Sequence, residues 1–129
     1  MRVFISLIAG VALCASSQTA IAKMAPKKAA FQLNETTWTF TDPKGVKVQE
    51  SIDANGNYIA NSIAGKHLDH GTAVMKDDKA CFTSAMDKKG EVCWTTKPVK
   101  VGQSVGTVSD KGEKLTVTRV KYAPLKMPK

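Results

Sequence analysis

Two cysteines have a spacing that favours a disulfide. Cys81 and Cys93 flank the segment Asp87-Lys88-Lys89-Gly90, which has the sequence of a tight turn between two strands. If the cysteines lie opposite each other in an antiparallel hairpin, side-chain alternation places Phe82 and Trp94 on the other face of the sheet. A redox-active pair would be indicated by a Cys-x-x-Cys spacing, which this pair lacks. We therefore predict a structural disulfide on the outer side of a hairpin whose aromatic rings enter the core.

The two histidines of the chain, His67 and His70, are separated by only two residues. Such a pair invites comparison with metal ligands, yet residues three apart on an extended strand point to opposite faces. Joint ligation would need a turn, at Gly65 or Gly71. The favoured interpretation is a surface loop with no metal role, and a joint metal site is the alternative.

Other motifs fall short of a catalytic or metal-binding site. Asp53, Asn55 and Asn57 occupy the first side-chain positions of a calcium loop, but Tyr58 replaces its turn glycine and Ala64 its closing glutamate. The sequence contains no Gly-x-Ser-x-Gly, no pair of acids placed for general acid and base roles, and no Gly-rich phosphate loop. We predict no catalytic residues, no cofactor and no enzymatic activity.

The segments that must position these residues have the pattern of short antiparallel strands. The sequence Asp-x-x-Gly occurs at Asp42, Asp53 and Asp87, and each copy is typical of a type I turn. Apolar and polar residues alternate between the turns, although Glu50 interrupts one apolar row. The expected strands cover residues 37–41, 46–53, 58–63, 72–76, 79–84, 91–96, 104–109 and 115–122.

About eight strands with short connections predict an all-β fold. We expect an antiparallel meander that closes into a small barrel, because most β-sandwiches need longer crossovers; a sandwich is the alternative. Aromatic residues make up only 6% of the chain. This low share favours a small packed interior over a roomy ligand cavity.

The first 22 residues have the features of a secretory signal peptide. Arg2 precedes an apolar run over residues 3–14, and Ala20-Ile21-Ala22 is a small-x-small cleavage site. The run is too short to span a bilayer, which takes about 20 apolar residues. Cleavage would also remove Cys14, so that two cysteines remain. We expect a periplasmic or secreted protein.

The 107 residues that remain after residue 22 suit one compact domain. We expect a β domain over residues 36–123, a flexible basic segment over residues 23–35 and a basic tail over residues 124–129. Loss of Arg2 lowers the formal net charge from +8 to +7. This charge favours an anionic envelope component or an acidic protein as partner. The candidate contacts are the lysines of the two ends: Lys23, Lys27, Lys28, Lys126 and Lys129.

Nucleic acid and a transmembrane segment are not expected. Arg119 is the only arginine after the leader, and aromatic residues are few, so the sequence offers neither bidentate base contacts nor a stacking platform.

Several motifs, in their order along residues 36–96, resemble those of small uncharacterised exported single-domain β proteins of alphaproteobacteria. These motifs are Trp38-x-Phe40, Asn55-Gly56-Asn57-Tyr58, Asp78-Lys79-x-Cys81-Phe82 and Cys93-Trp94. The resemblance implies a periplasmic β domain and carries no established activity. Trp38 on the first strand is also similar to the lipocalin pattern, although Thr36 stands where lipocalins have glycine, so that likeness is one of architecture.

Two classes of function follow. The first is a non-enzymatic binding or interaction module of the cell envelope that uses its basic surface. The alternative is a lipocalin-like carrier of a small apolar ligand held inside the barrel.

Overall fold

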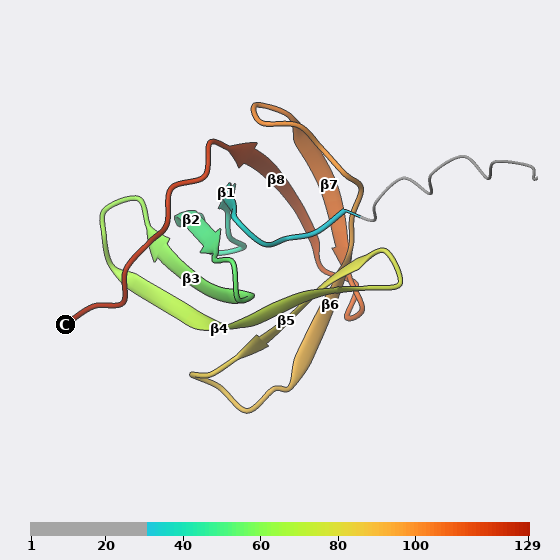
Figure 1. Cartoon of the computed structure of the whole chain (residues 1–129). Coiled ribbons are helices and arrows are strands. Elements are labelled where there is room, and N and C mark those ends of the chain that lie inside the picture. Colours follow the sequence, from blue (N-terminus) through green and yellow to red (C-terminus); the bar gives the residue numbers. More distant parts are fainter. Residues whose placement is uncertain (1–30) are drawn as a thin grey trace, which may run out of the picture.

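The protein is an eight-stranded antiparallel β-barrel, and its computed structural model describes residues 31–129 (Figure 1). Each strand pairs with its neighbours in sequence, and β8 pairs with β1 to close the barrel. The strands are β1 (Thr36–Thr41), β2 (Lys47–Ile52), β3 (Asn57–Ser62), β4 (His67–Lys76), β5 (Lys79–Ser84), β6 (Glu91–Thr95), β7 (Ser104–Ser109) and β8 (Lys114–Val120). The predicted meander barrel is confirmed, and the sandwich alternative is wrong.

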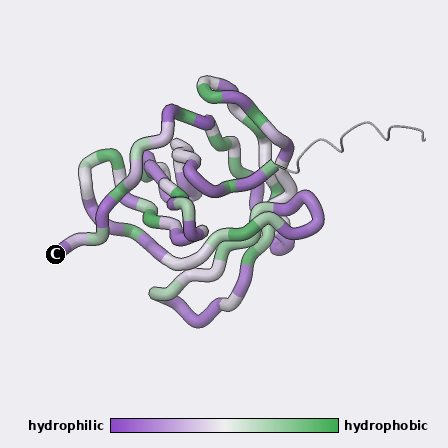
Figure 2. Tube along the Cα trace, viewed as in Figure 1, coloured by the Kyte–Doolittle hydropathy of each residue, from purple (hydrophilic) through white to green (hydrophobic). Residues whose placement is uncertain are grey.

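The Asp-x-x-Gly segments at Asp42 and Asp53 form the predicted turns, whereas Asp87 and Gly90 belong to a longer connection between β5 and β6 that lacks the Asp-to-Gly backbone hydrogen bond. In the β1–β2 turn, the Asp42 carboxylate accepts hydrogen bonds from the backbone N–H groups of Lys44 and Val46, both at 2.9 Å. Gly45 closes this turn with a φ of 83°, in the left-handed region that glycine tolerates best. The Asp53 turn repeats the arrangement. These turns are hydrophilic, whereas the strands between them carry residues of both kinds (Figure 2).

The strand β4 is longer than predicted, because it begins at His67 rather than at Thr72. Gly71, which we considered as a turn residue, lies in the middle of this strand. A Cβ atom at this position would come within 1.9 Å of the Thr83 carbonyl oxygen on β5. Glycine is therefore needed for the close approach of two backbones and does not mark a turn.

Side-chain alternation gives the barrel an inner and an outer wall. Along β1 and β2, paired residues share a face, so Trp38 and its partner Glu50 both point inward, as do Phe40 and Val48. The buried apolar cluster contains Leu33, Trp38, Ile52, Tyr58, Ala73 and Ala80.

The chain before β1 closes one end of the barrel. Leu33 is 3% exposed and belongs to the core cluster, and the ring of Phe31 packs edge-on against Trp38 at 6.4 Å. The guanidinium of Arg119 lies 5.8 Å from the centre of the Phe31 ring. The packed domain therefore starts before residue 36, our expected boundary. Residues 1–30, with the expected signal peptide and the lysines at 23, 27 and 28, lie outside the described residues.

The C-terminal segment runs along the outside of β1 and β2. The Ala123 N–H donates to the Thr37 hydroxyl at 2.8 Å, and the Leu125 N–H donates to the Ser51 hydroxyl at 2.9 Å. The side chains of Lys126 and Lys129 beyond these contacts are exposed. Over residues 31–129 there is no helix long and apolar enough to cross a membrane.

Candidate functional site

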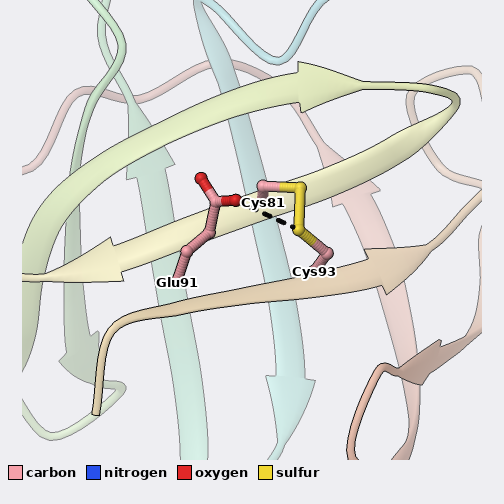
Figure 3. Close-up of side chains that lie close together, drawn as sticks. All are labelled: Cys81, Glu91 and Cys93. Atoms are coloured by element: carbon pink, nitrogen blue, oxygen red, sulfur yellow. Dashed lines mark hydrogen bonds between the residues drawn. A yellow bond between two sulfur atoms is a disulfide. The ribbon is translucent and has the colours of Figure 1, made fainter.

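The β5–β6 hairpin carries the predicted disulfide in the predicted register. Cys81 lies opposite Cys93, and their Sγ atoms are at bonding distance, 2.13 Å (Figure 3). The pairs next to them follow the same register: Phe82 lies opposite Val92, and Ala80 lies opposite Trp94. Phe82 and Trp94 point into the barrel, as expected, whereas the disulfide is on the outer wall.

A third group, the Glu91 carboxylate, lies beside this disulfide on the outer wall (Figure 3). Its Oε1 is 3.6 Å from the Cys93 Sγ, and its Oε2 pairs with the Lys76 ammonium at 2.7 Å. The two sulfurs and the carboxylate are close enough to share a metal ion. Metal coordination by cysteine requires thiolates, however, and the disulfide leaves none. The group is therefore a structural element of the hairpin.

The interior of the barrel holds a cavity of about 480 Å³. This volume lies within the range of about 300–1,000 Å³ that is usual for small-molecule sites. Our expectation of a small packed interior is wrong. Small side chains occupy inward positions on three neighbouring strands, Ala60 on β3, Ala73 on β4 and Ala80 on β5, and Ala80 lines the cavity.

The cavity has an apolar wall with aromatic rings from four strands. Both tryptophans of the chain contribute to it. The apolar lining consists of Leu33, Trp38, Phe40, Ala80, Phe82, Val92, Trp94, Leu115 and Val117. Turn residues between β1 and β2, β5 and β6, and β7 and β8 form the rim, at the end of the barrel opposite the Phe31 and Leu33 closure. They are mostly exposed, so this rim gives the cavity its access to solvent.

A polar cluster on the inner wall is centred on Asp69. The Tyr58 hydroxyl donates a hydrogen bond to Asp69 Oδ2 at 2.7 Å, and the Ser84 hydroxyl donates to Oδ1 at 2.5 Å. The backbone N–H of His70 donates to the same Oδ1 at 2.9 Å. Burial, followed by the hydrogen bond to Asp69, raises the pKa of Tyr58. Tyr58 therefore remains a neutral donor, and Asp69 is a fixed acceptor.

Glu50 is a second acidic group on the inner wall, and it differs from Asp69 in having no hydrogen-bond donor among residues 31–129. Burial from bulk solvent, with a smaller contribution from the charge of Asp69, raises its pKa to about 8. At neutral pH the Glu50 carboxyl group is therefore mostly protonated and can donate or accept a hydrogen bond.

Positive charge is kept away from these two acids. Lys89, Lys111 and Lys114 belong to the rim of the cavity or to the strand end beside it. Arg119 points inward on β8, but its guanidinium donates to the Val99 carbonyl at 3.0 Å and lies over Phe31 at the closed end. It does not line the cavity.

The two histidines lie on the outer wall of β4, and the loop interpretation is wrong. A β-bulge shifts the register between the pairs Ala60–Asp69 and Asn61–His67. The extra residue restores His67 and His70 to one face, with His67 Nε2 only 3.0 Å from His70 Nδ1. Asn61 Oδ1 is 2.9 Å from His67 Nδ1, so the half-buried imidazoles form a hydrogen-bonded chain. The alternation rule failed here because it assumes a regular strand.

The residues that line the cavity were not predicted as a site. One signal was present in the sequence: Glu50 occupies an apolar position of its strand, where a charged residue is costly. Asp69 was missed because its segment was interpreted as a surface loop, whereas Asp69 continues the inward alternation of Gly71 and Ala73 along β4. Comparisons of the chain with protein-family models, with curated proteins and with solved structures found no match.

Proposed function

We propose that this protein is an exported, non-enzymatic binding protein that holds a small ligand inside its barrel. The observation that carries the proposal is the cavity of about 480 Å³ with its aromatic wall and its exposed rim. A large apolar cavity with a few convergent polar groups is the usual form of a small-molecule site. The eight-stranded barrel is one of the architectures that can enclose a single small ligand.

The polar groups of the cavity favour binding over catalysis. The two oxygens of Asp69 already accept three hydrogen bonds, which fix the carboxylate in one orientation. Glu50 has no hydrogen-bond partner among residues 31–129, so its carboxyl group has capacity left for a ligand. An arrangement of one fixed acceptor, one open carboxyl group and apolar rings suits recognition of a mostly apolar molecule that carries a polar group.

This proposal favours the carrier hypothesis over the surface-binding hypothesis that we ranked first. The surface hypothesis depends on basic ends, of which the structure describes Lys126 and Lys129. These two lysines are exposed and do not line the cavity. The carrier hypothesis, in contrast, is supported by a cavity that has both apolar and polar lining residues. The expected leader and periplasmic or secreted location are part of this proposal.

A fluorescent probe tests the proposed cavity. N-Phenyl-1-naphthylamine is a neutral aromatic dye whose emission rises when it leaves water, and it is small enough for the cavity. We expect saturable binding with one dye per protein. Absence of saturable binding would contradict the proposal.

Two matched variants show whether the dye enters the barrel. Val92→Trp adds a large ring to the cavity wall, whereas Val108→Trp adds the same ring at an exposed position on the outer wall. We expect Val92→Trp to weaken binding by roughly tenfold or more and Val108→Trp to leave it unchanged. Equal effects of the two substitutions would place the dye on the surface. The unfolding transition of each variant confirms that it is folded.

A further inference from the structure

The two acidic groups of the cavity lie in one row across the barrel wall. The register aligns Trp38 on β1 with Glu50 on β2, Glu50 with Ala60 on β3, and Ala60 with Asp69 on β4. The two acids are thus two strand spacings apart, or about 10 Å between backbones. Only the small Ala60 stands between them in the row, and both acids line the same cavity. A ligand in this space contacts both.

The charge of this row is not balanced by the protein. The groups that face Glu50 are Asp69 and the Tyr58 hydroxyl, and neither is positive. Beyond Trp38 the next residue of the row is Arg119, which is directed to Val99 and Phe31 at the closed end. Within the part of the chain that the structure describes, no cationic side chain lines the deep part of the cavity. Buried carboxylates are costly unless a positive partner accompanies them.

Aromatic rings surround the same space. Trp38, Tyr58, Phe82 and Trp94 all line the cavity, and the Tyr58 and Phe82 rings meet edge-to-face at 5.3 Å. The face of an aromatic ring attracts cations, and several rings together form the usual site for alkylated ammonium groups. The rings also provide apolar contact for the rest of a ligand.

We propose that the ligand of this cavity is a small organic cation, an alkylated or protonated amine with an apolar body. Its positive group lies between Glu50 and Asp69, and its apolar part packs on the aromatic wall. This inference rests on the proposed function, because it names the class of ligand that the cavity holds.

Binding of a cation has a consequence for the proton on Glu50. A positive group beside this carboxyl favours its ionised form, so the proton leaves for solvent as the ligand binds. With a pKa of about 8 for Glu50 in the empty protein, the fraction of ionised carboxyl rises about tenfold between pH 7 and pH 9. The affinity for a permanent cation rises by the same factor if the ionised form binds it.

Three compounds of nearly equal shape separate charge from size. Phenyltrimethylammonium is a permanent cation, tert-butylbenzene is its neutral counterpart, and benzenesulfonate is an anion. Because both tryptophans of the chain line the cavity, intrinsic fluorescence reports binding of each compound without a label. Isothermal calorimetry in buffers of different ionisation enthalpy measures the proton that is released.

At pH 9 we expect the cation to bind roughly tenfold or more tightly than the anion. From pH 7 to pH 9 the affinity for the cation rises about tenfold, with release of close to one proton at pH 7, while the affinity for the neutral compound stays within about twofold. Glu50→Gln removes the pH dependence and lowers the affinity for the cation about tenfold at pH 9. The control Glu91→Gln, which neutralises an exposed acid of the outer wall, changes neither.

The possible failures are distinguishable. Binding of the neutral compound, with an affinity for the cation that responds neither to pH nor to Glu50→Gln, overturns the cation inference and leaves the carrier function standing. Tighter binding of the anion does the same. If none of the three compounds changes the tryptophan emission or produces heat up to its solubility limit, the proposed function and the inference fall together.

Discussion

Glu50 is expected to reduce the stability of the fold at neutral pH, and its replacement by glutamine should therefore stabilise the protein. The pKa of Glu50 is about 8 in the folded protein against an ordinary value of 4.5. Between these values the folded state holds a proton that the unfolded state has lost. The free energy of unfolding therefore falls as pH rises from 4.5 to 8, by up to about 1.4 kcal/mol per pH unit.

The magnitude follows from the same two pKa values. Ionisation of Glu50 stabilises the unfolded state relative to the folded state by about 3 kcal/mol at pH 7 and by about 1 kcal/mol at pH 5. Glutamine has nearly the same shape and does not titrate. Glu50→Gln should thus raise the free energy of unfolding by about 3 kcal/mol at pH 7 and by about 1 kcal/mol at pH 5.

Urea unfolding of the wild type and of Glu50→Gln at half-unit steps between pH 4.5 and pH 8 measures this difference directly. Other titrating groups are common to both proteins, so the difference between the two curves isolates Glu50. As a control, Glu91→Gln should change stability by less than about 1 kcal/mol, because its ion pair with Lys76 is exposed. A difference between wild type and Glu50→Gln that is constant with pH, or a variant less stable than wild type at pH 7, would refute the reasoning.

Three further predictions concern the outer wall and the C-terminal segment. Reduction of the hairpin disulfide should lower the free energy of unfolding by about 3 kcal/mol, measured by urea unfolding with and without reductant. Two titratable thiols in the untreated folded protein would contradict the disulfide. The double variant His67→Ala with His70→Ala removes two part-buried hydrogen bonds and should lower the free energy of unfolding by about 2 kcal/mol, measured by thermal unfolding. A chelator should leave the melting temperature of the wild type unchanged, and a lower melting temperature on chelation would reveal a structural metal. Lys126→Gln with Lys129→Gln should weaken cosedimentation with phosphatidylglycerol vesicles roughly fivefold per lysine at low salt, and unchanged binding would exclude these lysines as the contact.

The parts of the fold that depend on local chemistry were predictable from the sequence. The Asp-x-x-Gly turns fixed the strand boundaries to within a residue or two for most strands, because the carboxylate and the glycine together select one backbone geometry. The register of the disulfide hairpin followed from the cysteine spacing and the two-residue alternation of strands.

The cavity and the histidine pair depend on features that the sequence does not display locally. A single bulge in β4 places His67 on the outer wall although Asp69, two residues further on, points inward. No residue type in this segment predicts the bulge. The volume of the cavity depends on the sum of all inward side chains after the barrel has closed, so a count of aromatic residues along the chain misjudged it. Glu50 was visible as an interruption of an apolar row, but its surroundings were not.

The central claim is that the barrel cavity holds a small ligand, and native mass spectrometry of the protein purified from its own cells tests this claim most directly. We predict a non-covalent adduct of one small molecule per wild-type chain that is absent or strongly reduced in Val92→Trp, where the added ring occupies the cavity, and retained in Val108→Trp on the outer wall. Detection of the bare chain alone in the wild type, or of the same adduct on all three proteins, would contradict it.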